Sequence, residues 1–385
     1  MKRFFFTFIF VLLLSGAAIA LTDRPVSHLN DAKIIQPSTN EVTFIVLGDF
    51  RTSRRDRAYH NIFEQILREV NTIAPSLIVS TGDAYYGYGG SMQGFKNEID
   101  YFLSKIKDLD VPFFSATGNH EVAGDAERER YAEKRFGRLY GSFDYGNMHF
   151  IMLNTDEVGK QGTISGEQLK WLEKDLETNK NAGNIFVFMH RPMFSVTDPE
   201  LVAGKSFKDK GNRDYLHSLF NRYKVKSVFA GHEHIFNETV KDGVRYFITG
   251  GAGSPLYQPP GKGGFFHYLI VKVNGRDVSI DVVVPYTIQT RTISGNDGFE
   301  SKAEIEIANI SFAGIDIRNL QFIMPAAAAD KYRVRATSIS KSGQTNAHAV
   351  RIRHVKDNKD GTATVSVETQ VPKNGLIRVV VEVDI

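Results

Sequence analysis

Five short apolar runs in this 385-residue chain each end in an acidic, amide or imidazole side chain. In four of the five, a glycine stands directly before that polar residue, as in Gly48-Asp49 and Gly82-Asp83. Such runs are typical of buried strands, and open α/β sheets build their sites at the carboxyl ends of strands. Glycine tolerates positive φ and close packing, so the chain can turn there and project the next side chain. The pattern therefore predicts one site assembled from Asp49, Asp83, Asn119, His120, His190, His232 and His234.

The segments between these runs alternate between strand-like and helical patterns. Apolar residues recur at helical spacing in 56–71, 95–106 and 169–176. Later hairpin turns are expected at Asp242-Gly243 and Asn274-Gly275. Alternating strands and helices followed by antiparallel hairpins are typical of a layered α/β domain with mixed sheets.

The first twenty residues have the order of a secretory signal peptide. Lys2 and Arg3 precede an apolar stretch from Phe4 to Leu14, and small residues then lead to Ala18-x-Ala20. Signal peptidase accepts this arrangement, and the apolar stretch is short for a span of about 20 residues, which favours cleavage over a retained membrane anchor. The chain has no cysteine, which excludes disulfides, thiolate metal sites and a lipoprotein anchor. We expect a secreted or periplasmic bacterial protein without a membrane anchor after cleavage.

Charge balance narrows the range of partners. Once Lys2 and Arg3 are removed with the signal peptide, basic and acidic residues are nearly equal in number. Such a balance gives no reason to expect nucleic acid or an anionic membrane as a partner. The sequence leaves the oligomeric state open.

Carboxylate, amide and imidazole groups together match a site for hard or borderline metal ions. In this order, and at these strand ends, the residues make the chain resemble the calcineurin-like metallophosphoesterases. The resemblance spans about residues 42 to 285 and implies a layered sandwich of two mixed β-sheets flanked by helices. Five motifs in order make it specific. They are Gly48-Asp49, Gly82-Asp83, Gly118-Asn119-His120-Glu121, Val187-x-x-His190 and Gly231-His232-x-His234.

A finer feature resembles the purple acid phosphatase branch of that family. Most members have Asp-x-His in the first motif, whereas Asp49-Phe50-Arg51 lacks this histidine and Asp83 is followed three residues later by Tyr86. In that branch a tyrosinate replaces the histidine and selects ferric iron. The resemblance implies Fe(III) held by Asp49, Asp83, Tyr86 and His234. It implies a second ion, Fe(II), Zn(II) or Mn(II), held by Asp83, Asn119, His190 and His232, with Asp83 as the bridge. If Tyr86 is not a ligand, we expect two divalent ions.

The implied chemistry is hydrolysis of a phosphate ester. Two metal ions about 3.5–4 Å apart can stabilise the attacking and leaving oxygens and lower the pKa of bound water to about 7. A trivalent cation can also deprotonate a coordinated phenol, whose free pKa is about 10. We expect in-line attack of metal-bound hydroxide on phosphorus, without a protein nucleophile. His120 would stabilise the transition state or protonate the leaving oxygen, and Arg51 would hold the substrate phosphate. Glu121 is interpreted as a supporting or surface-helix residue.

Beyond about residue 290 the apolar pattern changes to a period of two. Ala303, Ile305 and Ile307 alternate with charged residues, and helical spacing is nearly absent. This alternation predicts a small all-β module, with a sandwich as the expected form. We therefore expect four parts, which are a signal peptide at 1–20, a leader arm at 21–40, a metallophosphoesterase domain at 41–288 and a C-terminal β-sandwich-like domain at 289–385.

Three functions remain open from the sequence. The first is an acid phosphatase-like enzyme that hydrolyses phosphate monoesters. The second is a phosphodiesterase or nucleotide hydrolase with two divalent metals, because the same kind of site cleaves both ester classes. The third is a non-catalytic binding protein on this scaffold, which the complete set of ligand positions disfavours.

Overall fold

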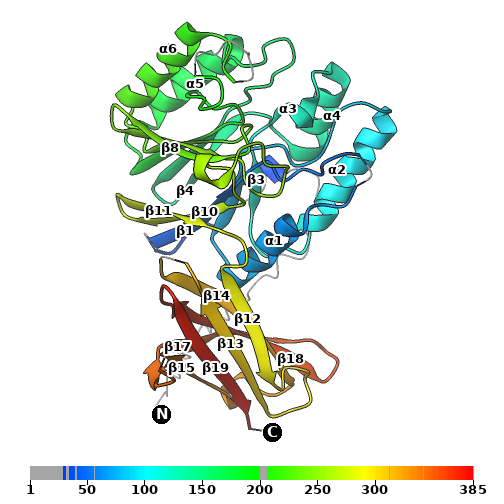
Figure 1. Ribbon diagram of the computed structural model, residues 1–385, viewed down its shortest axis with the longest axis vertical. Helices are drawn as coiled ribbons and strands as arrows, with labels where there is room; N and C mark the ends of the chain where they lie inside the picture. The colour runs from blue at the N-terminus through cyan, green and yellow to red at the C-terminus, as the bar shows by residue number, and fades with distance from the viewer. Residues whose placement is uncertain are drawn as a thin grey trace, which may run out of the picture.

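The computed structural model describes residues 29–31, 34–39, 41–55, 57–199, 206–311, 313–340 and 342–384. The expected signal peptide at 1–20 lies outside the described residues. The described chain forms two packed β-sheets flanked by helices, with a further all-β region below them in Figure 1. None of the described helices is long and apolar enough to cross a bilayer.

Both sheets of the α/β part are mixed, as the sequence predicts. In the first sheet, β1, β2 and β3 are parallel, while β10 pairs antiparallel with both β1 and β11. Its order is β11 (Asp277–Val283), β10 (Tyr268–Asn274), β1 (Glu41–Leu47), β2 (Leu77–Ser80) and β3 (Phe113–Ser115). In the second sheet, the central strands are parallel and the two edge pairs are antiparallel. Its order is β4 (Gly141–Tyr145), β5 (Met148–Met152), β6 (Asn184–Phe188), β7 (Ser227–Ala230), β9 (Val244–Thr249) and β8 (Phe236–Lys241).

Helices cover the outer face of each sheet (Figure 1). The second sheet carries α5 (Gly166–Thr178) and α6 (Lys210–Arg222), whose buried residues pack with those of β6 and β7. The first sheet carries α1 (Asn61–Ile73), α2 (Met92–Ile106), α3 (Asn119–Val122) and α4 (Ala126–Phe136). Short 3₁₀ turns occur at Leu29–Asp31, Pro260–Lys262 and Ala329–Lys331. The apolar stripe of each helix is buried because the strands beneath it present apolar side chains on both faces.

Aromatic side chains fill the space between the two sheets. Phe44 on β1 lies at the centre of this layer, with its ring centroid 5.2 Å from those of both Phe150 and Phe186. Edge-to-face contacts of this kind add to the free energy gained by burial. This core fixes how the two sheets face each other, and therefore how their strand ends meet.

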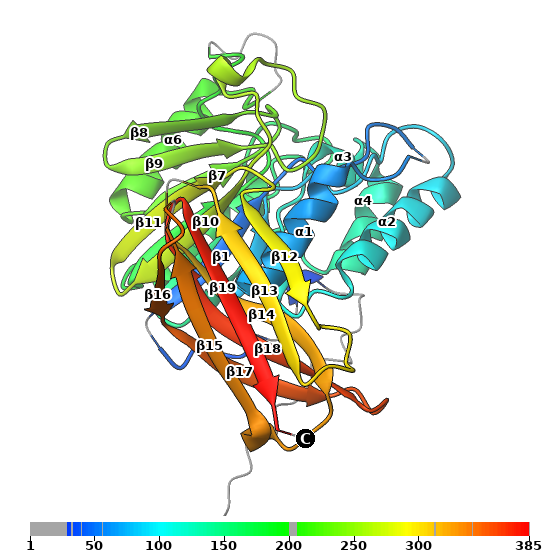
Figure 2. The ribbon, with the colours of Figure 1, turned by 60° about the horizontal axis from the view of Figure 1, so that its bottom comes forward.

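The C-terminal strands form two antiparallel sheets that pack on each other (Figure 2). The order of the larger is β12 (Ile288–Ser294), β13 (Lys302–Asn309), β19 (Gly375–Val383), β15 (Tyr332–Ile339) and β16 (Thr345–His348). The order of the smaller is β14 (Ile315–Pro325), β18 (Thr362–Val371) and β17 (Val350–Asp357). Their buried residues belong to the same cluster as those of α1, α2 and the first sheet, so the apolar core is continuous between the two regions. An all-β C-terminal region is thus confirmed.

One buried histidine gives the fold a pH-dependent contribution. His149 on β5 makes hydrogen bonds to Asp144 at 2.6 Å and to Asp175 at 2.8 Å. Burial lowers the pKa of His149, but these two carboxylates outweigh it and raise the pKa above 6.5. A raised folded-state pKa stabilises the fold below the unfolded pKa, and this contribution is lost as pH rises through the folded pKa. We expect His149→Gln to lower the unfolding free energy more at pH 5.5 than at pH 8.5, as measured by urea unfolding. A loss that is equal at both pH values would contradict this role.

Candidate metal centre

The residues predicted from the strand ends lie at the carboxyl ends of neighbouring strands in both sheets. Hydrogen bonds continue past the strands here, from Asp49 N to Gly82 O at 3.0 Å and from Gly231 N to His190 O at 2.9 Å. The two sheets are joined at this edge, because the backbone N–H of His232 donates to Asp49 Oδ2 at 2.8 Å. The sandwich therefore brings side chains that are far apart in the sequence into one buried site.

Four of these side chains stand on strained backbone. Asp49, Asp83, His232 and His234 have φ angles of 55°, 59°, 72° and 44°. Side-chain-bearing residues rarely adopt this left-handed region, and each such residue costs roughly 1–3 kcal/mol unless its surroundings hold it. Such strain gathers at functional sites, because it aims a side chain in a direction that relaxed backbone would not allow.

The glycines before the ligands act mainly through close packing rather than through positive φ. Gly118 has φ −95°, yet a Cβ there would lie 2.4 Å from Asp83 Oδ1. A Cβ at Gly231 would lie 2.3 Å from Asp49 Oδ2. Among the glycines that precede a ligand candidate, positive φ occurs only at Gly82, with φ 95°. The expected turn-making role therefore belongs to Gly82, while other glycines leave room for the carboxylates.

A first cluster contains Asp49, Asp83 and His234, whose ligand atoms all lie within 4.8 Å of one another. His234 Nδ1 lies 2.6 Å from the Pro255 carbonyl, so Nδ1 carries the proton and Nε2 presents its lone pair. That Nε2 lies 3.2 Å from Asp49 Oδ1, and this oxygen accepts no hydrogen bond from the described residues. A buried carboxylate oxygen that faces an imidazole lone pair needs a cation between them.

A second cluster surrounds His190, which is fully buried. Its Nδ1 lies 2.9 Å from the Thr81 carbonyl, which leaves Nε2 as the lone-pair nitrogen. This Nε2 lies 3.0 Å from Asn119 Oδ1, 3.1 Å from His232 Nδ1 and 3.3 Å from Asp83 Oδ1. Asp83 is thus the one residue that belongs to both clusters.

The electrostatics of the site favour bound positive charge. Burial works to raise the pKa of Asp49, but His234, His190 and His232 outweigh it and hold the pKa well below its usual range. Burial lowers the pKa of His190, and Asp83 and Asp49 reverse this, so its net pKa is raised. Burial, with His190 and Arg191 nearby, holds the pKa of His232 well below 6.5, which keeps that imidazole neutral as a ligand must be. The donor set therefore fits a pair of cations bridged by Asp83.

His120 and Arg51 lie beside the clusters. His120 Nδ1 is hydrogen-bonded to the Tyr86 carbonyl, and its Nε2 lies 3.7 Å from Asp83 Oδ2. Burial lowers the pKa of His120, although Asp83 acts in the opposite direction. Arg51 Nε lies 3.8 Å from the same Asp83 oxygen and donates no hydrogen bond to the described residues. Both side chains thus face the position where a substrate would meet the clusters.

The position of Tyr86 gives less support for its predicted role as a metal ligand than the positions of Asp49, Asp83 and His234 do for theirs. Its ring lies 5.8 Å from the His120 ring and 5.9 Å from the Arg51 guanidinium carbon. Within the described part of the chain, no hydrogen bond joins its hydroxyl to Asp49, Asp83 or His234. Its assignment as a ligand remains a prediction.

Several residues that support the site were not predicted from the sequence. Arg191 forms an ion pair with fully buried Asp156 at 2.7 Å, and its NH1 lies 3.3 Å from His232 Nε2. Asn119 Nδ2 donates to the Tyr88 hydroxyl at 3.1 Å, which turns the amide oxygen toward His190. A signal for Asp156 existed, because the apolar run that ends at Leu153 is followed by Asn154-Thr155-Asp156.

The sequence left Glu121 as either a residue that supports the site or a surface-helix residue, and the structure shows the first. It is buried, and its carboxylate accepts the backbone N–H groups of Asp83, Ala84 and Gly118 at 2.9, 2.6 and 2.7 Å. Burial and the nearby Asp83 carboxylate raise the pKa of Glu121 to about 7. These three bonds join the two loops that carry Asp83 and Asn119.

The chain is similar to a known protein family and to several of its members. The family model of the calcineurin-like phosphoesterases matches residues 35–236. A protein of Arabidopsis thaliana named "Probable inactive purple acid phosphatase 24" is 25% identical over an alignment of 263 positions, which covers 55% of this chain and 41% of that protein. A Xenorhabdus bovienii protein named "Probable cyclic nucleotide phosphodiesterase" is 28% identical over 176 residues, 45% of this chain and 66% of that protein. The chain thus matches less than two thirds of the length of each of these relatives.

A solved structure supports the fold. Purple acid phosphatase PPD1 from yellow lupin superposes with a TM-score of 0.50 at 17% identity, covering 71% of this chain and 52% of that one. The family model covers more than half of the chain, and its residues include the strand ends that carry Asp49, Asp83, Asn119, His190 and His234. The chain therefore belongs to the calcineurin-like phosphoesterase family and resembles its purple acid phosphatase branch.

Proposed function

We propose that this protein is a secreted, two-metal enzyme that hydrolyses phosphate monoesters. The observation that carries the proposal is the pair of buried clusters that share Asp83. A single carboxylate common to both clusters would hold two cations close enough to act on one phosphoryl group. Secretion is proposed from the order of charged, apolar and small residues in 1–20.

Two bound cations would supply an activated water molecule and would neutralise charge on the phosphoryl oxygens. The chain's own residues would bind and orient the ester. Arg51 Nε is a buried donor without an acceptor among the described residues. A phosphoryl oxygen of the substrate would accept its hydrogen bond. The imidazolium form of His120 would donate its Nε2 proton to the leaving oxygen, and the water that replaces this oxygen on phosphorus would give up a proton in turn.

A preference for monoesters follows from the charged groups beside the clusters. Arg51 and Arg191 both lie next to proposed metal ligands, with Nε 3.8 Å from Asp83 Oδ2 and NH1 3.3 Å from His232 Nε2. A monoester carries one more negative charge than a diester near neutral pH, so it gains more from each guanidinium. Asp156 holds Arg191 in one orientation, which reduces the entropy lost on binding.

The substrate class can be tested with two chromogenic esters. We expect the purified, metal-loaded protein to contain two metal ions per chain and to show a higher kcat/KM for p-nitrophenyl phosphate than for bis(p-nitrophenyl) phosphate. A higher value for the diester would overturn the monoester assignment. Hydrolysis of neither ester by protein with two bound ions would support a binding protein on this scaffold instead.

The metal identity has two candidates. Iron(III) with Fe(II), Zn(II) or Mn(II) requires Tyr86 as a ligand, and a visible charge-transfer band that Tyr86→Phe abolishes would support it. Two divalent ions are the second candidate, and they do not require the Tyr86 hydroxyl as a ligand. A colourless, active Zn(II) or Mn(II) protein would establish the second candidate.

A further inference from the structure

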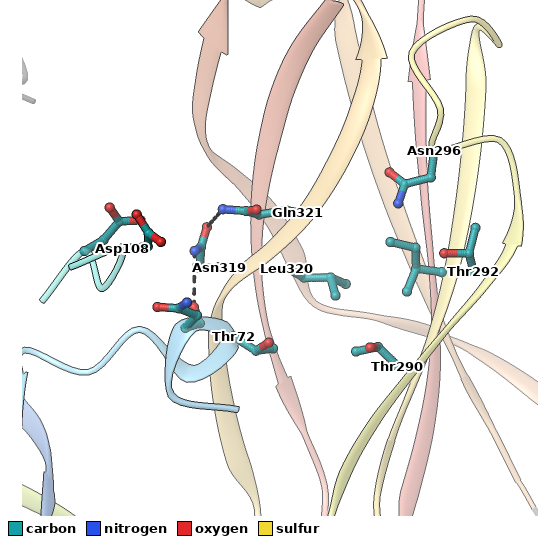
Figure 3. A pocket seen from close by; sticks show the side chains of 11 residues that line it. Thr72, Asp108, Thr290, Thr292, Asn296, Asn319, Leu320 and Gln321 are labelled. Carbon is teal, nitrogen blue, oxygen red and sulfur yellow. Dashed lines mark hydrogen bonds between the residues drawn. The ribbon is translucent and has the colours of Figure 1, made fainter. Parts of the chain in front are cut away.

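A polar cleft lies between the α/β part and the C-terminal sheets. Its volume is about 370 Å³. One wall contains the end of α1, with Asn71 and Thr72, and the loop that carries Asp108. Figure 3 shows Asn319 and Gln321 of β14 between this wall and the threonines of β12.

This cleft is separate from the metal centre. The centre lies at the carboxyl ends of β1, β2 and β3, whereas α1 ends at Ile73, just before β2 begins at Leu77. Asp108 and Asp110 likewise precede the start of β3 at Phe113. The cleft is therefore at the amino ends of the strands, at the opposite edge of the sheet.

The side chains that line the cleft disfavour anions and largely apolar molecules as ligands. It contains amides, hydroxyls and two carboxylates, with Leu320 and Ile305 as its aliphatic side chains. No lysine or arginine is among the residues that line it, so an anion would meet Asp108 and Asp110 without a compensating charge. A lipid or another largely apolar molecule would leave most of the polar groups without partners.

Some of these polar groups are already oriented. Asn319 Nδ2 donates to the Asn71 carbonyl at 3.2 Å, and Gln321 Nε2 lies 3.4 Å from Asn319 Oδ1. This chain of bonds joins β14 to α1 and fixes the two amides, while Gln321 remains exposed. The hydroxyls of Thr290 and Thr292 make no hydrogen bond with other described side chains, so they can serve a ligand.

We propose that this cleft binds a neutral saccharide. Sugar hydroxyls donate to carboxylates and amide oxygens and accept from amide N–H groups and threonine hydroxyls, so they match the lining group by group. Leu320 and Ile305 are each only 4% exposed, so a sugar ring would meet mainly the polar groups of the lining. A volume of about 370 Å³ lies at the lower end of the range for small-molecule sites and suits a short oligosaccharide. The C-terminal sheets would then help to attach the enzyme to a glycan, independently of phosphate ester hydrolysis.

The test uses the intact chain on a printed array of neutral hexose and N-acetylhexosamine oligosaccharides, with glucose 6-phosphate and spermidine as competitors in solution. We expect binding to at least one neutral oligosaccharide, and at least tenfold weaker binding for Gln321→Ala and for Asp108→Ala. Gln93→Ala is the matched control, because this exposed α2 side chain donates to Asn97 Oδ1 at 2.9 Å, away from the cleft. Its binding should equal that of the wild type.

Three results would overturn the proposal. They are no binding anywhere on the array, equal binding by the wild type and both cleft variants, and binding that glucose 6-phosphate or spermidine competes for better than free neutral sugar does. Thermal unfolding of every variant checks that a loss of binding is not a loss of the fold. Because array binding needs no turnover, failure here is distinguishable from failure of the proposed phosphatase activity.

Discussion

Asp83→Asn is expected to lower kcat/KM for p-nitrophenyl phosphate at least about a thousandfold, equivalent to ~4 kcal/mol of transition-state stabilisation. Asp83 is the one residue common to the two clusters, and its Oδ1 also accepts the His120 backbone N–H at 3.1 Å. An amide keeps the shape of the side chain but removes the negative charge that would bridge two cations. We therefore expect the metal content to fall below two ions per chain together with the activity.

The measurement pairs elemental analysis with steady-state kinetics on the same preparation. Asp277→Asn is the matched control, because Asp277 is exposed on β11 and the substitution is chemically identical. This control should retain wild-type activity and metal content. Wild-type kinetics from Asp83→Asn with two bound ions would refute the bridging role.

Phe44→Ala is expected to destabilise the protein by about 3–5 kcal/mol, the usual cost of a large cavity in a packed core. Phe44 is fully buried between the sheets, with edge contacts to Phe150 and Phe186 at 5.2 Å and to Phe188 at 6.4 Å. Removal of its ring takes away the contact that these three aromatic side chains of β5 and β6 make with β1, and strands on both sides are too constrained to close the gap.

Urea unfolding measures this loss directly. Phe299→Ala is the matched control, since its side chain is 84% exposed and the same substitution there should change stability by no more than about 0.5 kcal/mol. Equal stability of Phe44→Ala and the control would show that the layer between the sheets does not determine the stability of the fold.

Local patterns in the sequence were sufficient for the strands and the strongly amphipathic helices. The run Phe44–Leu47 is entirely buried in β1, and the apolar spacing in 56–71 corresponds to α1, Asn61–Ile73. The other three described helices, α3, α4 and α6, were not predicted from apolar spacing. Of α4, Ala126–Phe136, only Ala132 and Phe136 are buried, so its apolar stripe is too narrow to recognise. Its start depends on Asp125, which caps two backbone N–H groups.

The sequence also indicated which polar residues would gather, because a ligand that follows a buried strand must lie at the sheet edge. It could not show how they are oriented. The left-handed φ angles at Asp49 and Asp83 and the contact between Asp49 Oδ2 and the His232 N–H arise only when the two sheets pack together. The same is true of the Asp156–Arg191 ion pair, which joins the ends of β5 and β6.

The sequence by itself thus determined the family, the mixed α/β architecture and the identity of the side chains at the strand ends, because these follow from local periodicity and motif order. Only the tertiary structure decided that the His232 backbone N–H meets Asp49 Oδ2 across the two sheets, that Arg51 lies beside Tyr86, and that a polar cleft opens at the far edge of the sheet. The physical reason is that such properties depend on distances between segments far apart along the chain. Packing of the two sheets and of the C-terminal strands sets those distances, and no local pattern encodes them.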